Sequence, residues 1–451
     1  MSQRFAAFSS QFAAGLSLAV WFLAAPVLCG QTRAGTPVPQ SEDPLIREAL
    51  AAFQSGELDA AIRKLRQAHE IAPANSYASL YLGLMLYQKN SGSLESQRLM
   101  ESVLDKFPTN QDLLLRLLDS YLLTGKEAKV PALLERMRRP LESNPRFAFT
   151  ILYVLVRYGQ LDPARRELGR IESRLRGQFR EGKELDPKAP SDQALAREFG
   201  EACFIKGMIA ASSDQKAEAM RLFQAADRYE FPARDAPQMS MLAEALSRME
   251  EYGLSAQAYE IYLARFPQDH GARLQAGIAH LYNASFARAR DQLKQVLEKA
   301  PATPMVNYYL GLALVELRQH DEARRHFERE LEGNPKSYQA MAQLANLDYL
   351  EGENQKCQRW LEKAAGLNPA WEETHFIYGL LYIRLRKYDL AVKSLENVIK
   401  QAPQHIKAHY NLSIAYRRSG NEPKAKEHAD IYSRLLEAHK ARSLGDDPRR
   451  K

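Results

Sequence analysis

Apolar residues recur along most of this chain with the spacing of an α-helix. A small residue is followed four positions later by a bulkier apolar one in a series of pairs. The clearest pairs are Ala289 and Leu293, Ala323 and Phe327, Cys357 and Leu361, and Ala391 and Leu395. Because residues four apart lie on one face of a helix, each pair predicts a helix with one apolar face. The pairs recur at a constant 34-residue interval, which indicates that the same helix is repeated.

Prolines keep the same 34-residue interval. They stand at Pro267, Pro301, Pro335, Pro369 and Pro403. Ten residues after each proline comes a small residue, in order Gly277, Gly311, Ala345, Gly379 and Ser413. We therefore predict repeats of two helices of about a dozen residues each, with close approach at the small residue and a proline after the second helix. A single helical hairpin cannot bury its own apolar face, so neighbouring repeats must stack.

One of these repeats matches a known pattern almost completely. Residues 307–311 read Asn-Tyr-Tyr-Leu-Gly, residues 321–323 read Asp-Glu-Ala, and Phe327 and Pro335 follow in phase. This pattern resembles the tetratricopeptide repeat family. The resemblance implies an all-α fold, a right-handed α-α superhelix of about ten to eleven helical hairpins whose first helices line a concave groove. The family's tryptophan early in the first helix is replaced here by Asn307, Met341, His375 and His409.

Proline spacing and composition divide the chain into seven parts. The interval from Pro145 to Pro232 exceeds two repeats by about nineteen residues, which predicts an extended loop or an overlong helix end at an irregular junction. The parts are a signal peptide or N-terminal anchor (1–30), a linker (31–43), degenerate repeats (44–171), an irregular basic insertion (172–192), further degenerate repeats (193–266), a regular array with a C-terminal capping helix (267–440) and a charged tail (441–451).

The N-terminal residues predict export. Residues 1–30 contain one charge, Arg4, and an uncharged run from Leu16 to Leu28, which is typical of a secretory signal peptide. We therefore expect a periplasmic or secreted protein. The alternative is an uncleaved anchor, because residues 12–30 are uncharged and spanning a bilayer takes about 20 residues. A lipid-modified Cys29 is less favoured, since Leu28 rather than a small residue precedes it.

Composition narrows the class of partner. With 45% hydrophobic residues among 451, the chain can bury a large core. The formal net charge is +7, and the last twelve residues carry +3 of it. We expect the remaining +4 to be spread along the chain, which is too sparse for a nucleic-acid partner. Three cysteines, Cys29, Cys203 and Cys357, do not build a disulfide scaffold.

The sequence carries no motif with a catalytic mechanism. It lacks a phosphate-binding glycine loop, a His-Glu-x-x-His segment, a Cys-x-x-Cys pair and a nucleophile elbow. His405 and His409 lie four apart, with His375 one repeat earlier, but a metal site needs three or four ligands. We expect these histidines to serve packing. Because repeats fill residues 44–440, we expect no enzyme, no cofactor and no metal.

One face of each first helix opposes the face that packs inside the hairpin. Its residues follow the spacing i, i+4, i+7, and the resemblance implies that they line the concave groove. The predicted partner-binding groove comprises Leu274, Ile278, Tyr308, Leu312, Asn346, Tyr349, Phe376, Leu380, Arg384, Lys407, Tyr410, Arg417 and Arg418. Most of these residues are apolar or aromatic, and basic residues gather toward the C-terminal end. The alternative is that part of each set is buried between adjacent first helices.

The sequence thus predicts an exported, non-enzymatic scaffold or adaptor that binds protein or peptide partners in its groove, with a cell-envelope assembly or secretion machine as one setting. Two alternatives remain, a self-associating structural module and a non-catalytic subunit of an enzyme complex. The lysine and asparagine clamp of the family's chaperone-binding members is not matched, because the corresponding positions hold Leu274, Tyr308, Phe376 and Tyr410. The sequence predicts no oligomeric state.

Overall fold

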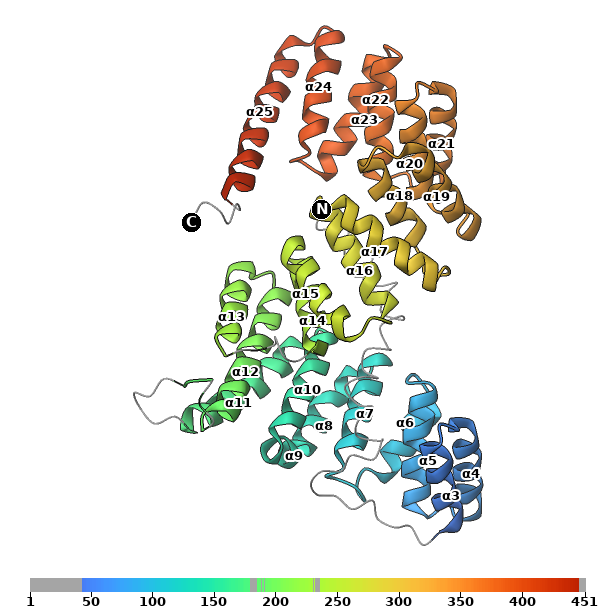
Figure 1. The fold of residues 1–451 in the computed structure, drawn as a ribbon, viewed down its shortest axis with the longest axis vertical. Coiled ribbons are helices and arrows are strands. Elements are labelled where there is room, and N and C mark those ends of the chain that lie inside the picture. Colours follow the sequence, from blue (N-terminus) through green and yellow to red (C-terminus); the bar gives the residue numbers. More distant parts are fainter. Residues whose placement is uncertain are drawn as a thin grey trace. The chain divides into compact units, whose positions relative to one another are not determined.

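The computed structural model describes residues 43–178, 185–187, 189, 191–229, 231 and 236–445. These residues form 23 α-helices and one short 3-10 helix, and they contain no strand. Successive helices pack in pairs, so the predicted all-α solenoid of helical hairpins is confirmed (Figure 1). Contacts divide the chain into an N-terminal unit that ends at Glu251 and a C-terminal unit that begins at Tyr252.

The N-terminal unit contains twelve α-helices and the 3-10 helix η2 in the described residues. In chain order they are α3 (Pro44–Gln54), α4 (Leu58–Ile71), α5 (Ser76–Lys89), α6 (Leu94–Val103), α7 (Gln111–Leu123), η2 (Glu127–Lys129), α8 (Val130–Arg136), α9 (Arg138–Ser143), α10 (Pro145–Arg157), α11 (Leu161–Gln178), α12 (Gln193–Ser212), α13 (Lys216–Arg228) and α14 (Ala236–Arg248). The short helix α9 lies between the hairpin of α7 and α8 and the hairpin of α10 and α11. It falls in the part of the chain where the prolines keep a looser interval than in the regular array.

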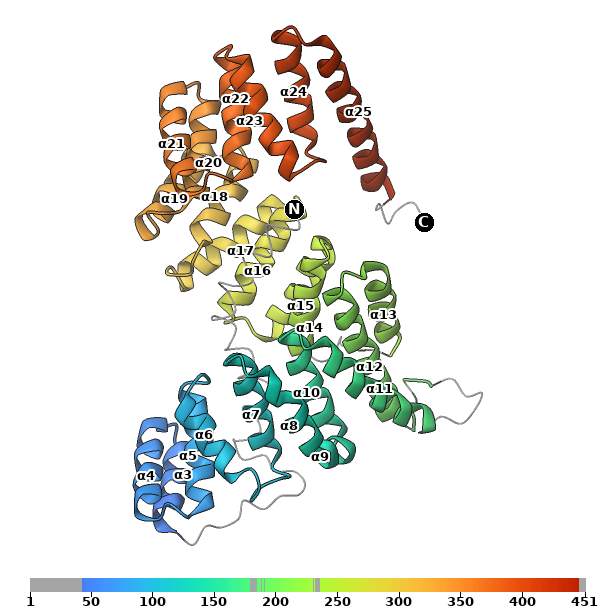
Figure 2. The ribbon, with the colours of Figure 1, turned by 180° about the vertical axis from the view of Figure 1, so that it is seen from behind.

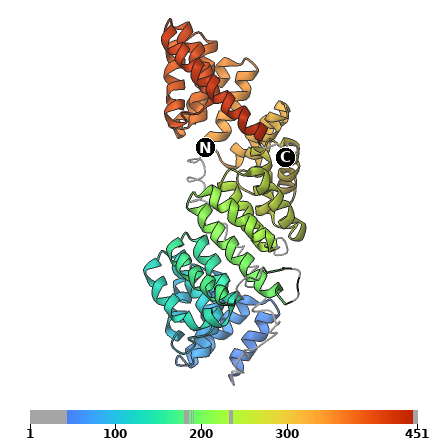
Figure 3. The ribbon, with the colours of Figure 1, turned by 90° about the vertical axis from the view of Figure 1, so that its left-hand side faces the viewer.

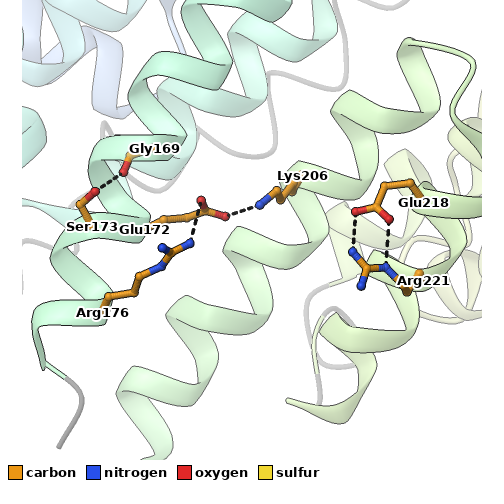
Figure 4. A network of polar contacts seen from close by, with 7 residues as sticks. All are labelled: Gly169, Glu172, Ser173, Arg176, Lys206, Glu218 and Arg221. Atoms are coloured by element: carbon orange, nitrogen blue, oxygen red, sulfur yellow. Dashed lines mark hydrogen bonds and ion pairs between the residues drawn. The ribbon is translucent and has the colours of Figure 1, made fainter. Parts of the chain in front are cut away.

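The predicted insertion at residues 172–192 begins as helix. Residues 172–178 continue α11, whereas residues 179–184, 188 and 190 lie outside the described residues. The charged side chains of this helix end have partners of opposite charge. Arg174 lies 2.7 Å from Glu198. Glu172 lies 2.9 Å from Lys206 of the next helix and 4.0 Å from Arg176 (Figure 4). Such partly exposed ion pairs contribute about 0–1 kcal/mol each. The described part of the insertion therefore offers a charge-balanced surface.

The C-terminal unit contains the regular array. Its helices are α15 (Tyr252–Arg265), α16 (His270–Tyr282), α17 (Phe286–Lys299), α18 (Val306–Glu316), α19 (His320–Gly333), α20 (Tyr338–Leu350), α21 (Asn354–Leu367), α22 (Glu372–Arg384), α23 (Tyr388–Gln401), α24 (Ile406–Arg418) and α25 (Glu422–Gly445). Several first helices begin at a capping side chain just after the repeat proline. Asp269 accepts from the Ala272 N–H at 2.8 Å, and Ser337 accepts from the Ala340 N–H. These caps satisfy backbone donors that the helix itself leaves unpaired.

The small residue of each repeat closes the hairpin. A Cβ atom built on Gly311 would lie 2.5 Å from Cε1 of Phe327, and one on Gly379 would lie 2.5 Å from Cγ of Leu395. Both partners belong to the second helix of the same repeat and are fully buried. The predicted close approach at this position is therefore confirmed.

The turn between the two helices of a repeat uses one left-handed residue. In the C-terminal unit these residues again follow the 34-residue interval, at Ala284, Arg318, Gly352, Arg386 and Gly420. Glycine adopts this conformation without strain, whereas the side chains of Ala284, Arg318 and Arg386 make it costly. The period seen in the side chains is thus present in the backbone as well.

The first helices lie on the inner side of each curved unit. In the C-terminal unit the successive first helices α16, α18, α20, α22 and α24 contact one another, whereas the successive second helices that the structure describes lack comparable contacts. The first helices α5, α7, α10, α12 and α14 of the N-terminal unit show the same difference. Elements that are closer together lie on the concave side of a stacked array. Figures 2 and 3 allow the hairpins of each unit to be followed from two further sides.

Polar pairs with one buried member join successive repeats of the C-terminal unit. A residue near the end of three first helices contacts the second helix of the preceding repeat. These pairs are His280 with Glu260 at 3.0 Å, Asp348 with Arg324 at 2.8 Å, and Tyr416 with Glu396 at 2.5 Å. Burial lowers the pKa of His280, although the Glu260 carboxylate opposes that effect. A buried polar group keeps its position only with a partner, so these pairs fix how one repeat sits on the next.

Candidate functional site

Four positions of each first helix lie on the inner side of the C-terminal unit, with the spacing i, i+4, i+7, i+8. We call them the first to fourth inner positions. The first is held by Leu274, Tyr308, Ala342, Phe376 and Tyr410, and the second by Ile278, Leu312, Asn346, Leu380 and Ile414. The third is held by Leu281, Val315, Tyr349, Ile383 and Arg417, and the fourth by Tyr282, Glu316, Leu350, Arg384 and Arg418. Side-chain exposure rises from the first position to the fourth.

Three predicted groove residues lie in the core. Leu274 and Ile278 of α16 are buried, and Phe376 of α22 is 8% exposed. Phe376 packs in one cluster with Leu395 and Leu412 of the neighbouring helices. The sequence placed these three residues on an open surface, whereas contact between successive first helices covers them. These three residues therefore follow the alternative prediction, which was burial between adjacent first helices.

Five further groove residues are half-buried, namely Tyr308, Leu312, Asn346, Tyr349 and Leu380. The Tyr308 ring has its centroid 5.3 Å from that of Tyr309 and 6.1 Å from that of Phe327. The backbone N–H of Tyr308 donates to the carboxyl group of Glu330, which is buried. Burial raises the pKa of Glu330. The middle of the inner surface therefore consists of half-buried ring edges and shorter side chains.

Two predicted residues from successive repeats are brought together. The guanidinium carbon of Arg384 lies 3.6 Å from the centre of the Tyr349 ring, and Arg384 also donates to the Tyr349 carbonyl oxygen. A cation over an aromatic face contributes about 0.5–1 kcal/mol at an exposed site. The stack holds the Arg384 side chain flat against the inner surface, while Arg384 itself remains exposed.

The last first helix, α24, carries the most open part of the predicted groove. Tyr410 is 48% exposed, and its ring centroid lies 5.3 Å from that of Tyr432 on α25. Lys407, Arg417 and Arg418 are exposed on the same helix. Arg417 lies 3.6 Å from Glu422, an exposed and therefore weak pair. The structure thus gathers four predicted residues on one helix, three of them cationic.

Sequence reasoning missed most of the fourth inner position. Tyr282, Glu316 and Leu350 are exposed there, and Leu350 is the most open of the apolar side chains at 51%. Arg384 and Arg418 hold the same position but were selected for their charge alone. The signal was available, because all five residues of this position keep the 34-residue interval and each lies four residues after a second inner position.

The histidines considered for a metal have structural contacts. Nε2 of His375 lies 2.8 Å from the Pro369 carbonyl oxygen, and Nε2 of His409 lies 2.9 Å from that of Pro403. A carbonyl oxygen only accepts, so both Nε2 atoms carry the proton. Nδ1 of His405 accepts from the Ala408 N–H and caps α24. Within the described ranges, no group of three or more His, Cys, Asp or Glu residues is arranged to hold a metal ion.

A buried histidine pair closes the last hairpin. Nδ1 of His409 lies 2.9 Å from Nδ1 of His428 on α25, and the Tyr416 ring stacks parallel to the His428 ring. Because Nε2 of His409 donates to Pro403, its Nδ1 accepts and Nδ1 of His428 donates. Burial lowers the pKa of His428, and the neighbouring His409 lowers it further.

Comparison with known proteins decides the family. The tetratricopeptide repeat model matches residues 46–110, 274–338, 310–366 and 379–439. The chain contains tetratricopeptide repeats. Three of the four matched stretches lie in the regular array of the C-terminal unit, where the 34-residue interval is strict. The first covers hairpins of the N-terminal unit, which the looser proline spacing had marked as degenerate.

Individual tetratricopeptide repeat proteins are only distantly similar. Anaphase-promoting complex subunit 3 of Schizosaccharomyces pombe is 21% identical over 152 residues, which are 34% of this chain and 23% of that protein. The match therefore spans about a quarter of that relative. The crystal structure of yeast Tom70 covers 90% of this chain and 96% of its own at 13% identity and a TM-score of 0.41. YrrB, described as a repeat protein with an unusual peptide-binding site, covers 41% and 95% at 21% identity and a TM-score of 0.30.

The N-terminal predictions lie outside the described residues. Residues 1–42 contain the predicted signal peptide or anchor and nearly all of the predicted linker. Among the helices that the structure describes, none combines the length and the apolar character needed to cross a membrane. Export and membrane attachment through residues 12–30 therefore stay predictions.

Proposed function

We propose that the inner surface of the C-terminal unit binds protein or peptide partners and that the chain acts as a non-catalytic scaffold or adaptor. The observation that carries this proposal is the exposure of large apolar and aromatic side chains on one surface. Tyr282 and Leu350 stand there at the fourth inner position and Tyr410 at the first, and exposed apolar side chains gathered on one face are typical of a binding site. Half-buried neighbours give each of them a rigid base, which suits interface anchors.

The proposal of a non-enzymatic role rests on the fold of the described residues and on the motifs of the sequence. Helical hairpins account for the described residues, and the sequence contains none of the motifs for nucleophilic, metal or phosphate chemistry named above. A stacked array offers a long, rigid surface at little cost in ordering entropy, as scaffolding requires. A non-catalytic subunit of an enzyme complex would use the same surface and is one form of this proposal.

We further propose that the protein is exported and works in the cell envelope or outside the cell. The charge-poor N-terminal sequence, with Arg4 followed by the apolar run from Leu16 to Leu28, supports this location. Cell fractionation combined with mass spectrometry of the mature N-terminus tests it. A cleaved protein in the periplasm or medium supports export with a signal peptide. An intact N-terminus in the membrane fraction supports the anchor, and an intact cytosolic protein contradicts the proposal.

The binding surface is tested by crosslinking and affinity capture from the native cell with two double variants. Leu350→Glu with Tyr410→Glu places charges on the exposed inner positions. Leu367→Glu with Leu390→Glu changes similarly exposed side chains on the second helices α21 and α23 and serves as the matched control. We expect the first variant to lose its partners and the control to keep them, with unchanged circular dichroism for both. Identical partner sets from a folded surface variant would show that binding lies elsewhere.

Self-association by end-to-end stacking is less supported. Ser433 of α25 is exposed. The position that corresponds to Ser433 in the preceding second helices is apolar and bulky in three of four cases, at Leu297, Leu331 and Ile399. Hairpins of a solenoid stack through apolar faces, and a polar outer face is typical of a terminal repeat. Light scattering over a range of concentrations tests this alternative, which requires a mass that grows with concentration.

A further inference from the structure

The charge of the C-terminal unit changes sign along the array. Residues 252–383 contain 14 Lys or Arg and 16 Asp or Glu, whereas residues 384–439, before the last twelve, contain 11 Lys or Arg and only 6 Asp or Glu. The expectation that the positive charge outside the tail is spread along the chain is therefore wrong. The excess begins at the end of α22 and continues through α24 and α25.

Part of this charge lies on the inner surface. Arg384, Arg417 and Arg418 occupy third and fourth inner positions, and Lys407 lies three residues before Tyr410 on α24. Acidic residues are sparse on the same side. Glu373 of α22 corresponds to Lys407 one repeat earlier, and Glu316 lies two repeats before Arg384. We call the set of Arg384, Lys407, Tyr410 and Arg418 the basic end.

The cations of the basic end have few counterions. None of the ion pairs among the described residues involves Lys407 or Arg418, and both side chains are exposed. The flat face of the Arg384 guanidinium stacks on the Tyr349 ring, and one of its N–H groups donates to the Tyr349 carbonyl oxygen. A guanidinium has five N–H donors, so most of those of Arg384 are left for another acceptor. Clustered charges of one sign without partners raise the local potential and attract a ligand of opposite charge.

Apolar side chains lie between these cations. Leu380, Ile383 and Ile414 are half-buried inner residues, and the ring of Tyr410 is 48% exposed among them. A ligand that covers the basic end must therefore satisfy cations and bury apolar surface together. A polypeptide in which acidic and apolar side chains alternate meets both needs.

We propose that the basic end binds a segment of a partner protein in which acidic residues stand beside aromatic or aliphatic ones. This inference rests on the proposed function and adds the chemistry of the partner. A flat bilayer fits poorly, because the cations lie on the concave side and the surface attraction of lipids decays within about 10 Å. Nucleic acid fits poorly as well, since duplex binders typically make about 6–10 phosphate contacts and the inner surface gathers only a few cations here.

The test is a selection of peptides from a random phage-displayed library on the purified full chain. Two variants are compared with it. Lys407→Glu with Arg418→Glu reverses the basic end, and Lys393→Glu with Lys400→Glu makes the same change in net charge on exposed residues of the second helix α23. We expect the unaltered chain and the control to enrich acidic peptides with apolar residues. Fluorescence anisotropy of an enriched peptide should then show affinity reduced about tenfold or more by the first variant and little changed by the second.

The outcomes separate this inference from the proposed function. Enriched peptides that lack acidic residues, yet lose binding with the Leu350→Glu and Tyr410→Glu variant, would overturn the acidic partner and leave the binding surface intact. Acidic peptides that bind the reversed chain equally well would place their site elsewhere and overturn the inference. Failure to enrich any peptide would count against both the inference and the proposed function.

Single-stranded RNA and vesicles of mixed phosphatidylcholine and phosphatidylserine are titrated in parallel. Tighter binding of either one at the basic end would replace the protein segment as its ligand.

Discussion

A close helix approach in the array, at Gly311, gives the sharpest structural test. In Gly311→Ala the new methyl carbon would lie 2.5 Å from Cε1 and 2.8 Å from Cζ of Phe327. Carbon atoms in good contact are about 3.5–4.0 Å apart, so the ring or the helix must move by about 1 Å. Phe327 is fully buried, so its ring cannot move away into solvent. Such overpacking costs about 1–3 kcal/mol.

A second glycine supplies the control. Gly366 lies in α21, also in the C-terminal unit, and a Cβ atom there would meet nothing within 4 Å. Both substitutions gain the helix propensity of alanine, worth about 1 kcal/mol, and only Gly311→Ala also suffers the clash. We therefore expect Gly366→Ala to be stabilised by up to about 1 kcal/mol and Gly311→Ala to be about 1–3 kcal/mol less stable than Gly366→Ala.

Urea unfolding followed by circular dichroism measures this difference. A stacked array need not unfold in one step, so hydrogen exchange of the amides of α18 and α19 accompanies the bulk measurement. The expected result is faster exchange in this hairpin for Gly311→Ala and unchanged exchange for Gly366→Ala. If Gly311→Ala is as stable as Gly366→Ala, the two helices are not held at the distance described here and the packing argument is refuted.

Three other measurements test the local structure. Arg318→Gly should raise stability by about 1 kcal/mol in thermal unfolding, because φ is 58° at this turn; a loss of stability would contradict the left-handed conformation. Arg324→Ala should cost about 3–5 kcal/mol, since it leaves the buried Asp348 carboxylate unpaired, and a neutral result would contradict that pair. The lowered pKa of His428 means that the unfolded chain binds this proton more readily, so stability should fall as the pH drops below about 6.5; a slope unchanged in His428→Asn would exclude this residue as its source.

The repeat could be predicted from sequence because packing inside a hairpin is local. Gly311 and Phe327 belong to the two helices of one hairpin, and the same small and large residues recur at every repeat, so their contact follows from one pattern. The extra helix α9 was not predictable in this way, and for the insertion the sequence left two alternatives open, an extended loop and an overlong helix end. Both segments fall where the interval is irregular, so no second copy defined their place in the pattern.

The candidate surface was predicted only in part, because exposure depends on neighbours that the period does not describe. Phe376 and Tyr410 share the first inner position, yet their exposed fractions are 8% and 48%. Phe376 has a first helix on each side, α20 and α24. No first helix follows α24 in the described residues, so Tyr410 stays open. The 34-residue interval identifies the face of the helix, and the number of adjacent first helices decides how much of that face is accessible.

The same reasoning explains why the basic end and the most open aromatic anchor coincide. Inside the array, the first inner position is buried or half-buried by packing between repeats, and the fourth is the exposed one. On α24 the first position is accessible as well, so one helix offers Tyr410, Lys407 and Arg418 together. A partner would then gain more specific contacts on this helix than on any interior first helix of the unit. We therefore expect substitutions on α24 to change which partner is bound, and substitutions at Tyr282 or Leu350 to weaken all partners alike.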